Sequence, residues 1–169
     1  KKNNSNLFKN IHATIYNKKI KFSLVTKKIE KNKIKRVLFC AQPLTMTNSE
    51  TIPKFIENYI KKYANKKLNF VIRLHPNDKK NTRLINYKFS NEIKKRIVIV
   101  DDAKYSIYDT FSNVTHCISS FSTTSIEASI FGIKSAVFGD DAKNIMYDFI
   151  KYYNLSFLKK KSNSLKKWI

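Results

Sequence analysis

Short apolar runs separated by amphipathic segments make up most of the chain after residue 33. The runs have the length of strands and are apolar almost throughout: VLFCA (37–41), LNFVIRL (68–74), RIVIV (96–100), VTHCI (114–118) and KSAVF (134–138). Strands buried on both faces have this pattern, whereas half-exposed strands alternate apolar and polar residues. The pattern therefore predicts a five-stranded parallel sheet covered by helices on both faces.

The segments between these runs have the spacing of helices. Helices are expected from about Ser49 to Tyr63, within Thr82–Lys95, over Ser106–Ser112, over 125–131 and from Ala142 to Tyr152. Gly132 stands where a glycine commonly ends a helix. The last helix is expected to turn Ile145, Met146, Phe149 and Ile150 inward. Alternating strands and helices predict an α/β domain with a doubly wound, Rossmann-like sheet.

The first 33 residues differ from the rest of the chain. They are polar, rich in Lys and Asn, and only weakly periodic. We expect residues 1–33 to be a lead-in or linker from an N-terminal half that lies outside this chain. Residues 34–169 are expected to form one Rossmann-like domain, since this length supports a single core.

The stretch CISSFSTTSIEA (117–128) combines the end of a strand, a hydroxyl-rich turn and the start of a helix. Thr124 and Glu127 have the spacing of a capping box, which predicts a helix beginning at Ser125. The N–H groups and the positive dipole end of that helix would suit a phosphate oxygen. Two interpretations stay open: the hydroxyls only cap and fill the turn, or they also face a ligand.

Ligands of doubly wound sheets bind beyond the carboxyl ends of the strands. This rule brings five segments to one edge as site candidates: Gln42-Pro43, His75-Pro76-Asn77, Asp101-Asp102, 119–125 and Gly139-Asp140. His75 could serve as an acid, a base or a donor to phosphate, or could be an ordinary loop residue. With two glycines in the chain, neither a G-x-G-x-x-G nor a P-loop motif is possible.

Charge and cysteine content narrow the function classes. The net charge is +22, but only four of the 34 basic residues are Arg, the residue that most often reads bases, so nucleic-acid recognition is not expected. The lysines suggest, as a second-rank idea, peripheral contact with an anionic membrane surface. Cys40 and Cys117 lie inside apolar runs and are expected in the core, with no zinc site. A cytoplasmic location is expected, because no signal peptide or membrane-spanning run is visible.

Four segments, in this order, carry a family resemblance: Gln42-Pro43-Leu44, Arg73-Leu74-His75-Pro76, Ser106-Ile107-Tyr108-Asp109 and Ser119–Ala128. Over roughly residues 37–152 the chain resembles the C-terminal half of GT-B glycosyltransferases that assemble bacterial surface polysaccharides. The similarity is greatest to sialyltransferases and polysialyltransferases that use CMP-sialic acid. The resemblance implies an inverting glycosyltransferase that works in capsule or lipooligosaccharide synthesis.

The resemblance also implies roles for individual residues. His75 would be the catalytic residue of this half, and with Pro76 it would face CMP. The phosphate oxygens would be bound by Ser119, Ser120, Ser122, Thr123 and Thr124. The remaining candidates for the nucleotide site are Gln42, Pro43, Arg73 and Glu127. Glu127 is expected either to cap the helix or to accept hydrogen bonds from the ribose.

The expected partners are a CMP-sugar donor and a glycan acceptor, with no metal or other cofactor. In the family the general base belongs to an acidic-acidic-Gly motif of the N-terminal half. This chain has Gly139-Asp140-Asp141, with the glycine first, so the chain is not expected to catalyse transfer alone. One alternative is an enzyme of similar fold that transfers glycerol phosphate from CDP-glycerol. The other is a basic, non-enzymatic module that binds nucleic acid.

Overall fold

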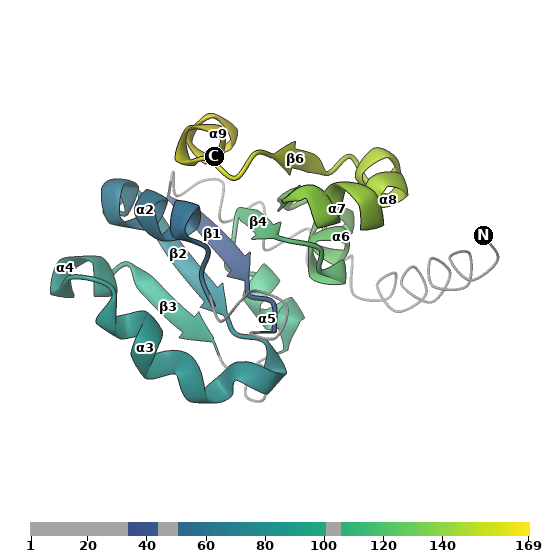
Figure 1. The fold of residues 1–169 in the computed structure, drawn as a ribbon. Helices are drawn as coiled ribbons and strands as arrows, with labels where there is room; N and C mark the ends of the chain where they lie inside the picture. Colours follow the sequence, from purple (N-terminus) through teal and green to yellow (C-terminus); the bar gives the residue numbers. More distant parts are fainter. Residues whose placement is uncertain (1–33, 44–50, 101–105) are drawn as a thin grey trace.

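The computed structural model describes residues 34–43, 51–100 and 106–169, which form a six-stranded parallel sheet with helices on both faces (Figure 1). The strands are β1 (Lys35–Cys40), β2 (Leu68–Arg73), β3 (Ile97–Val100), β4 (His116–Ser119), β5 (Lys134–Phe138) and β6 (Ser156–Leu158). The five strands predicted from the apolar runs are confirmed. The sixth, β6, was missed because it has three residues in a lysine-rich tail.

The strand order is β3-β2-β1-β4-β5-β6, and every neighbouring pair is parallel. This is the order of the doubly wound Rossmann sheet, in which the direction of winding reverses between the first and fourth strands. The predicted fold class is therefore confirmed. In sheets of this order, ligands bind beyond the carboxyl ends of the strands on either side of the reversal, which here are β1 and β4.

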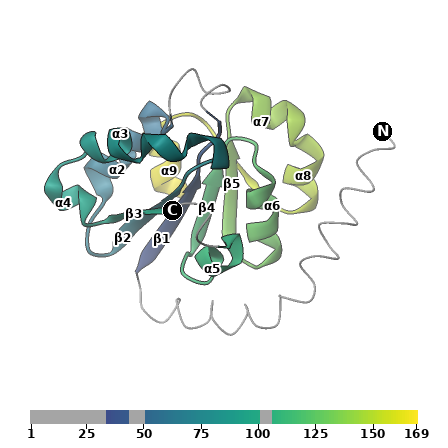
Figure 2. The same ribbon diagram turned by 90° about the horizontal axis from the view of Figure 1, so that it is seen from below.

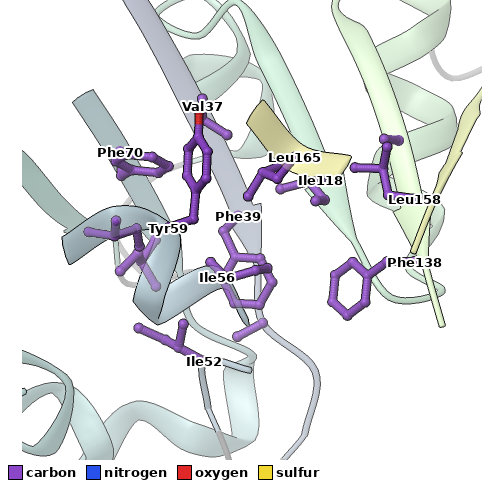
Figure 3. Close-up of a cluster of buried hydrophobic side chains, with 14 of the residues drawn as sticks. Val37, Phe39, Ile52, Ile56, Tyr59, Phe70, Ile118, Phe138, Leu158 and Leu165 are labelled. Atoms are coloured by element: carbon purple, nitrogen blue, oxygen red, sulfur yellow. The ribbon is translucent and has the colours of Figure 1, made fainter. Parts of the chain in front are cut away.

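One face of the sheet is covered by α2 (Lys54–Tyr63), α3 (Thr82–Tyr87), α4 (Asn91–Lys94) and α9 (Ser162–Trp168). Figure 3 shows side chains of this cluster from α2, α9 and the strands of the sheet, among them Ile56, Leu165 and Phe39. The tail helix α9 buries Leu165 and Trp168 and lies against α2. The apolar pair at the end of the lysine-rich tail therefore belongs to a helix of the core.

The other face carries α5 (Ile107–Phe111), α6 (Thr123–Ile130), α7 (Asp140–Ile145) and α8 (Tyr147–Tyr152). Figure 2 shows these helices toward the β4–β5 side of the sheet. Cys40 and Cys117 are buried in the cluster under α5 and α6, with no disulfide, so their expected place in the core is confirmed. Burial and a hydrogen bond with Cys117 raise the pKa of the Cys40 thiol, the hydrogen bond contributing more.

The segment expected as one helix from Ala142 to Tyr152 is two short helices. α7 begins two residues earlier, and the helices meet at Met146, whose φ of −103° and ψ of 11° interrupt the α conformation. The break turns Met146 and Phe149 inward, as predicted, but leaves Ile145 61% exposed. The prediction that Ile145 packs inward is therefore wrong.

The end of α6 confirms the position of Gly132. Its φ is +79°, a conformation that costs glycine little because it has no Cβ. Gly132 N–H donates to the Ser129 carbonyl at 2.9 Å, and Ile133 N–H donates to the Ala128 carbonyl at 3.0 Å. These two bonds form a Schellman motif, which turns the chain directly into β5.

Two further predictions concern the start of α2 and the loop after β3. The helix expected from Ser49 begins at Lys54, with Pro53 at its N-cap, and residues 44–50 lie outside the described part. The pair Asp101-Asp102 also lies outside the described residues. No helix in the described ranges is long and apolar enough to cross a membrane.

Candidate functional site

The carboxyl ends of four strands lie in one row across the sheet. Cys40 is the register partner of both Arg73 and Ser119, and Ser119 is the partner of Val137. The loops that follow β1, β2, β4 and β5 therefore leave the sheet at the same edge. This edge holds the Gln42, His75, Ser120 and Gly139 loops, with the β1–β4 reversal in the middle.

The hydroxyl-rich turn starts α6 earlier than the capping-box pattern predicted. Ser122 is the N-cap: its hydroxyl oxygen accepts a hydrogen bond from Thr124 N–H at 3.2 Å and the hydroxyl donates to Thr124 Oγ1 at 3.0 Å. The predicted start at Ser125, with Thr124 as cap, is therefore wrong. Ser122 takes this role because its φ of −82° and ψ of 138° are those of an N-cap.

Ser119 and Ser125 form a buried pair beneath the turn. Their hydroxyl oxygens lie 2.7 Å apart, and both residues are completely buried. Ser119 Oγ also accepts a hydrogen bond from Ser122 N–H at 3.3 Å. Ser119 thus holds the end of β4 to the start of α6. It positions the turn from below, where no ligand reaches its side chain in this conformation.

The other hydroxyls of the turn lie nearer the surface. Thr123 is exposed at the first position of α6, and Ser120 and Ser122 are half-buried. Ser120 Oγ donates to the carbonyl of Phe138 at 3.3 Å, which ties the end of β4 to the end of β5. Thr124 is half-buried as well, and its Oγ1 accepts the Ser122 hydroxyl. Thr123 is therefore the exposed hydroxyl of the turn, whereas the protons of Ser120 and Ser122 are donated within the protein in this conformation.

His75 follows β2 at the same edge and has a defined ring orientation. Its Nδ1 accepts a hydrogen bond from the backbone N–H of Asn77 at 3.3 Å, and its carbonyl accepts from Asp78 N–H at 2.8 Å. In the neutral ring the proton must then sit on Nε2, because a nitrogen that accepts cannot also carry the proton. The half-buried ring offers Nε2–H as a donor. Pro76 is exposed and begins the 3-10 helix η2 (Pro76–Asn81).

Gln42, Pro43 and Arg73 differ in how they meet this edge. Gln42 is 8% exposed, directly after β1, and Pro43 is half-buried beside it. Arg73 is also 8% exposed, and its Nη1 donates to Thr110 Oγ1 at 3.1 Å. The guanidinium therefore lies with α5 on one face of the sheet. There the guanidinium adds positive charge beneath the sheet edge, and its hydrogen bond to Thr110 holds α5 against β2.

Glu127 pairs with Tyr108, although its predicted capping-box partner was Thr124. Burial raises the pKa of the Glu127 carboxyl, and a hydrogen bond with Tyr108 partly offsets this by lowering the pKa. Burial likewise raises the pKa of Tyr108, and the negative charge of Glu127 adds to the rise. The capping-box role of Glu127 is therefore wrong. The carboxyl joins α6 to α5 one helical turn below the hydroxyls of the turn.

Lys160 was not among the predicted site residues, yet it lies at this edge. A Cβ on Gly139 would come within 2.9 Å of Lys160 Cε, 3.4 Å of its Nζ and 3.8 Å of Ser120 Oγ. Gly139 has a φ of +95°, so the absence of a side chain there serves both the turn and the approach of Lys160. The lysine comes from the connection between β6 and α9. The weak sequence signal of β6 hid this placement.

Together these groups make an edge suited to an anion. The His75 Nε2–H, the Lys160 ammonium and the exposed Thr123 hydroxyl are donors, and α6 adds the positive end of its dipole. The Ser120 and Ser122 hydroxyls become donors once they rotate away from their internal acceptors. Among the described residues no group of three or more His, Cys, Asp or Glu side chains lies in a metal-binding arrangement. The absence of a metal from the predicted mechanism stays a prediction.

The strand order and the arrangement of helices identify the fold class. The chain is a Rossmann-like α/β domain with the architecture found in glycosyltransferases of the GT-B type. A solved structure with this fold is the spinosyn rhamnosyltransferase SpnG in complex with thymidine diphosphate. It matches with a TM-score of 0.52 and 12% sequence identity, over 80% of this chain and 34% of SpnG. The wall teichoic acid polymerase TagF aligns with a TM-score of 0.47 and 15% identity, over 85% of this chain and 37% of TagF.

The structural similarity to SpnG shows a common fold and no more. The chain spans about a third of the length of SpnG. No protein-family model matches the sequence, and no curated protein sequence matches it. Substrate and reaction therefore have to be argued from the residues at the sheet edge.

Proposed function

We propose that this domain is the half of a glycosyltransferase that binds the donor nucleotide, with the nucleotide phosphate at the edge between β1 and β4. The observation that carries the proposal is that the His75 loop, the Ser120–Thr123 turn and Lys160 lie along the same edge of the sheet, with Lys160 beside Ser120 at Gly139. The glycosyltransferase-like fold supports it. Loops from β2, β4 and β5, together with the tail, supply donors along this edge.

Each group has a distinct task in the proposed site. The Nε2–H of His75 and the ammonium of Lys160 approach the phosphate from the two sides of the β1–β4 reversal, and Thr123 donates from its exposed hydroxyl. Ser120 and Ser122 donate after their hydroxyls rotate away from Phe138 and Thr124. Ser119 and Arg73 hold the surrounding elements in place from below. Gln42 and Pro43 border the crevice on the β1 side, and Thr124 supports the Ser122 cap.

The proposed donor is a CMP-sugar, with sialic acid as the transferred sugar and a glycan as the acceptor. In inverting transfer the bond between the sugar and the phosphate oxygen breaks while the acceptor oxygen attacks from the opposite face. Negative charge then develops on the departing CMP phosphate, and donors placed in advance stabilise it. The acceptor proton would pass to a carboxylate of a second domain. Glu127 is proposed to accept hydrogen bonds from the ribose through its carboxyl, beside Tyr108.

A thermal-shift titration tests the proposal. We expect CMP to raise the unfolding temperature, because a ligand that binds only the folded state stabilises it. CMP-sialic acid and CDP-glycerol then separate the two donor classes: stabilisation by CDP-glycerol alone would favour glycerol-phosphate transfer. Binding of RNA or DNA that falls steeply with salt, with no response to CMP, would instead identify a nucleic-acid module.

Variants at the edge provide the residue-level part of the same test. His75→Ala and Lys160→Ala should each weaken CMP binding roughly tenfold, which corresponds to about 1.4 kcal/mol. Lys159→Ala is the matched control, since it removes the same charge from the neighbouring exposed position. Equal weakening by Lys159→Ala would mean that net charge, and not a placed ammonium, attracts the nucleotide.

A further inference from the structure

One face of the sheet is uncovered over β2 and β3 in the part of the chain that the structure describes. The helices on that side, α5 and α6, lie toward β4 and β5, as Figure 2 shows. Val98, in the middle of β3, is 59% exposed. Parallel sheets are normally covered on both faces, because their strands are apolar on both. An exposed valine in such a strand marks a surface that another molecule can cover.

A groove of about 510 Å³ lies on this uncovered face, bounded by three strands and by α5. Its volume is in the range of sites for small molecules. The lining residues that matter here are Arg36, Asn69, Val71, Arg96, Val98 and Asp109. All of them lie away from the candidate nucleotide edge, which is formed by loops beyond the carboxyl ends of the strands.

The strand register arranges the lining side chains in two rows. Arg36 is the partner of Asn69, and because Phe70 pairs with Ile97, Asn69 stands beside Arg96. This first row therefore presents Arg, Asn and Arg on three adjacent strands at their amino ends. Neighbouring strands are about 4.8 Å apart, so the two Arg backbones are roughly 10 Å apart and one oxyanion above Asn69 is within reach of both guanidiniums.

The second row is apolar. Val71 and Val98 are register partners one pleat further along the same face. The groove thus continues from a cationic end onto a strip of valine side chains. A ligand that satisfies both rows needs an anionic group joined to an apolar body.

The charges of the lining side chains support an anionic head group. Lys95 adds a third cation to the lining, against the single carboxylate of Asp109. The side-chain oxygen of Asn69 is buried and makes no hydrogen bond with any residue in the described ranges. This amide oxygen accepts hydrogen bonds, so its partner here is a water or a protonated oxygen of the ligand, and the anionic oxygens are left to the arginines. A second copy of this chain is a poor occupant, since its own net charge is +22.

We propose that this groove binds an anionic amphiphile, with a phosphate or carboxylate group between Arg36 and Arg96 and an apolar chain along Val71 and Val98. The site is independent of the proposed nucleotide site. The two guanidinium groups recognise the anionic end of the ligand, and the valines contact its apolar end.

Calorimetric titration with decyl phosphate, decanoate, inorganic phosphate and decyltrimethylammonium tests this proposal, at concentrations below micelle formation. We expect one equivalent of decyl phosphate or decanoate to bind, and the cationic amphiphile not to bind. Inorganic phosphate should bind at least tenfold more weakly, because it lacks the apolar body. Binding of decyl phosphate no tighter than inorganic phosphate would overturn the amphiphile assignment.

Paired variants localise the binding. Arg36→Ala combined with Arg96→Ala should weaken decyl phosphate binding more than tenfold, and Val98→Asp should weaken it similarly through an exposed position that leaves the core intact. Lys143→Ala combined with Lys151→Ala removes the same charge from exposed sites on α7 and α8 and should change the affinity less than twofold. Equal loss in this control pair would overturn the proposal in favour of general charge attraction.

The source of the amphiphile is distinguished by vesicles that contain phosphatidate. Binding to vesicles that the Arg36→Ala and Arg96→Ala pair abolishes assigns the ligand to membrane lipid. Binding of decyl phosphate without retention on vesicles assigns it to a free amphiphile. In both cases the response to CMP should be unchanged by these variants, so failure of this proposal leaves the nucleotide proposal separately testable.

Discussion

His116 shows how a single buried side chain ties the tail helix to the sheet. It begins β4, is 7% exposed, and its ring meets the Trp168 ring edge-to-face at a centroid distance of 5.2 Å. Burial, and to a smaller extent the nearby charges of Lys134 and Lys35, lower the pKa of His116 to about 4. Both lysines also donate to backbone carbonyls at the end of α9. The neutral imidazole is therefore the form that fits beside α9.

This environment predicts a loss of stability in mild acid. The unfolded chain binds a proton at His116 with a pKa near 6.5, while the folded chain does so only at about 4. Between these values the unfolded state holds more protons, so stability falls as the pH falls through this window. From pH 7 to about pH 5 the loss from this residue is roughly 1–2 kcal/mol.

Urea unfolding of the wild type and of His116→Phe at both pH values measures this contribution. The variant keeps an aromatic ring against Trp168 and has no titrating group, so it should lose less stability on acidification by roughly 1–2 kcal/mol. Carboxylates that titrate in the same range are common to both proteins and cancel in the comparison. An equal loss in the two proteins would show that His116 does not titrate in the way its surroundings indicate.

At the scale of elements, α6 shows where a local sequence pattern is ambiguous. Ser122, Thr123 and Thr124 are all suitable N-cap residues, and the glutamate at 127 favoured Thr124. A tertiary contact selects Ser122 as the N-cap. Ser119 accepts a hydrogen bond from Ser122 N–H and forms a hydrogen bond with Ser125, and these two bonds fix the start of the helix. Tyr108 then takes up Glu127.

The cap assignment predicts an order of stabilities. Ser122→Ala removes the acceptor for Thr124 N–H and should lower the free energy of unfolding by about 1 kcal/mol. Thr124→Ala removes only a hydroxyl inside the first turn and should cost less than half of that. Urea denaturation at neutral pH gives both values. The reverse order, with Thr124→Ala the more damaging change, would restore the capping box.

Strand β6 in the tail and the break between α7 and α8 are two features that the local sequence pattern did not predict. Neither β6, with three residues, nor the kink at Met146, which has no Gly or Pro beside it, leaves a periodic signal. Both depend on packing: Leu158 and Leu165 join the core, and Phe149 turns inward. The hidden position of Lys160 follows from this, because it lies between β6 and α9.

At the scale of the whole molecule, the five apolar runs were sufficient to predict the strands and their parallel arrangement. The order of strands was not predictable from the runs, since any βαβ series could wind to either side. The strand-end rule nevertheless placed His75, Gln42 and the 119–125 turn at one edge, as the register now shows. The exposure of each hydroxyl depends on how deeply the folded chain buries it. The sequence alone therefore could not distinguish the buried Ser119 from the half-buried Ser120.

The central claim is that this edge of the sheet is a phosphate pocket for a donor nucleotide. Calorimetric titration of the chain with CMP and with cytidine tests it most directly, because the two ligands differ only in the phosphate. Charge-assisted hydrogen bonds contribute about 1.5–3 kcal/mol each, so CMP should bind at one site and at least tenfold more tightly than cytidine. Equal affinities for CMP and cytidine, or no binding of either, would contradict the account.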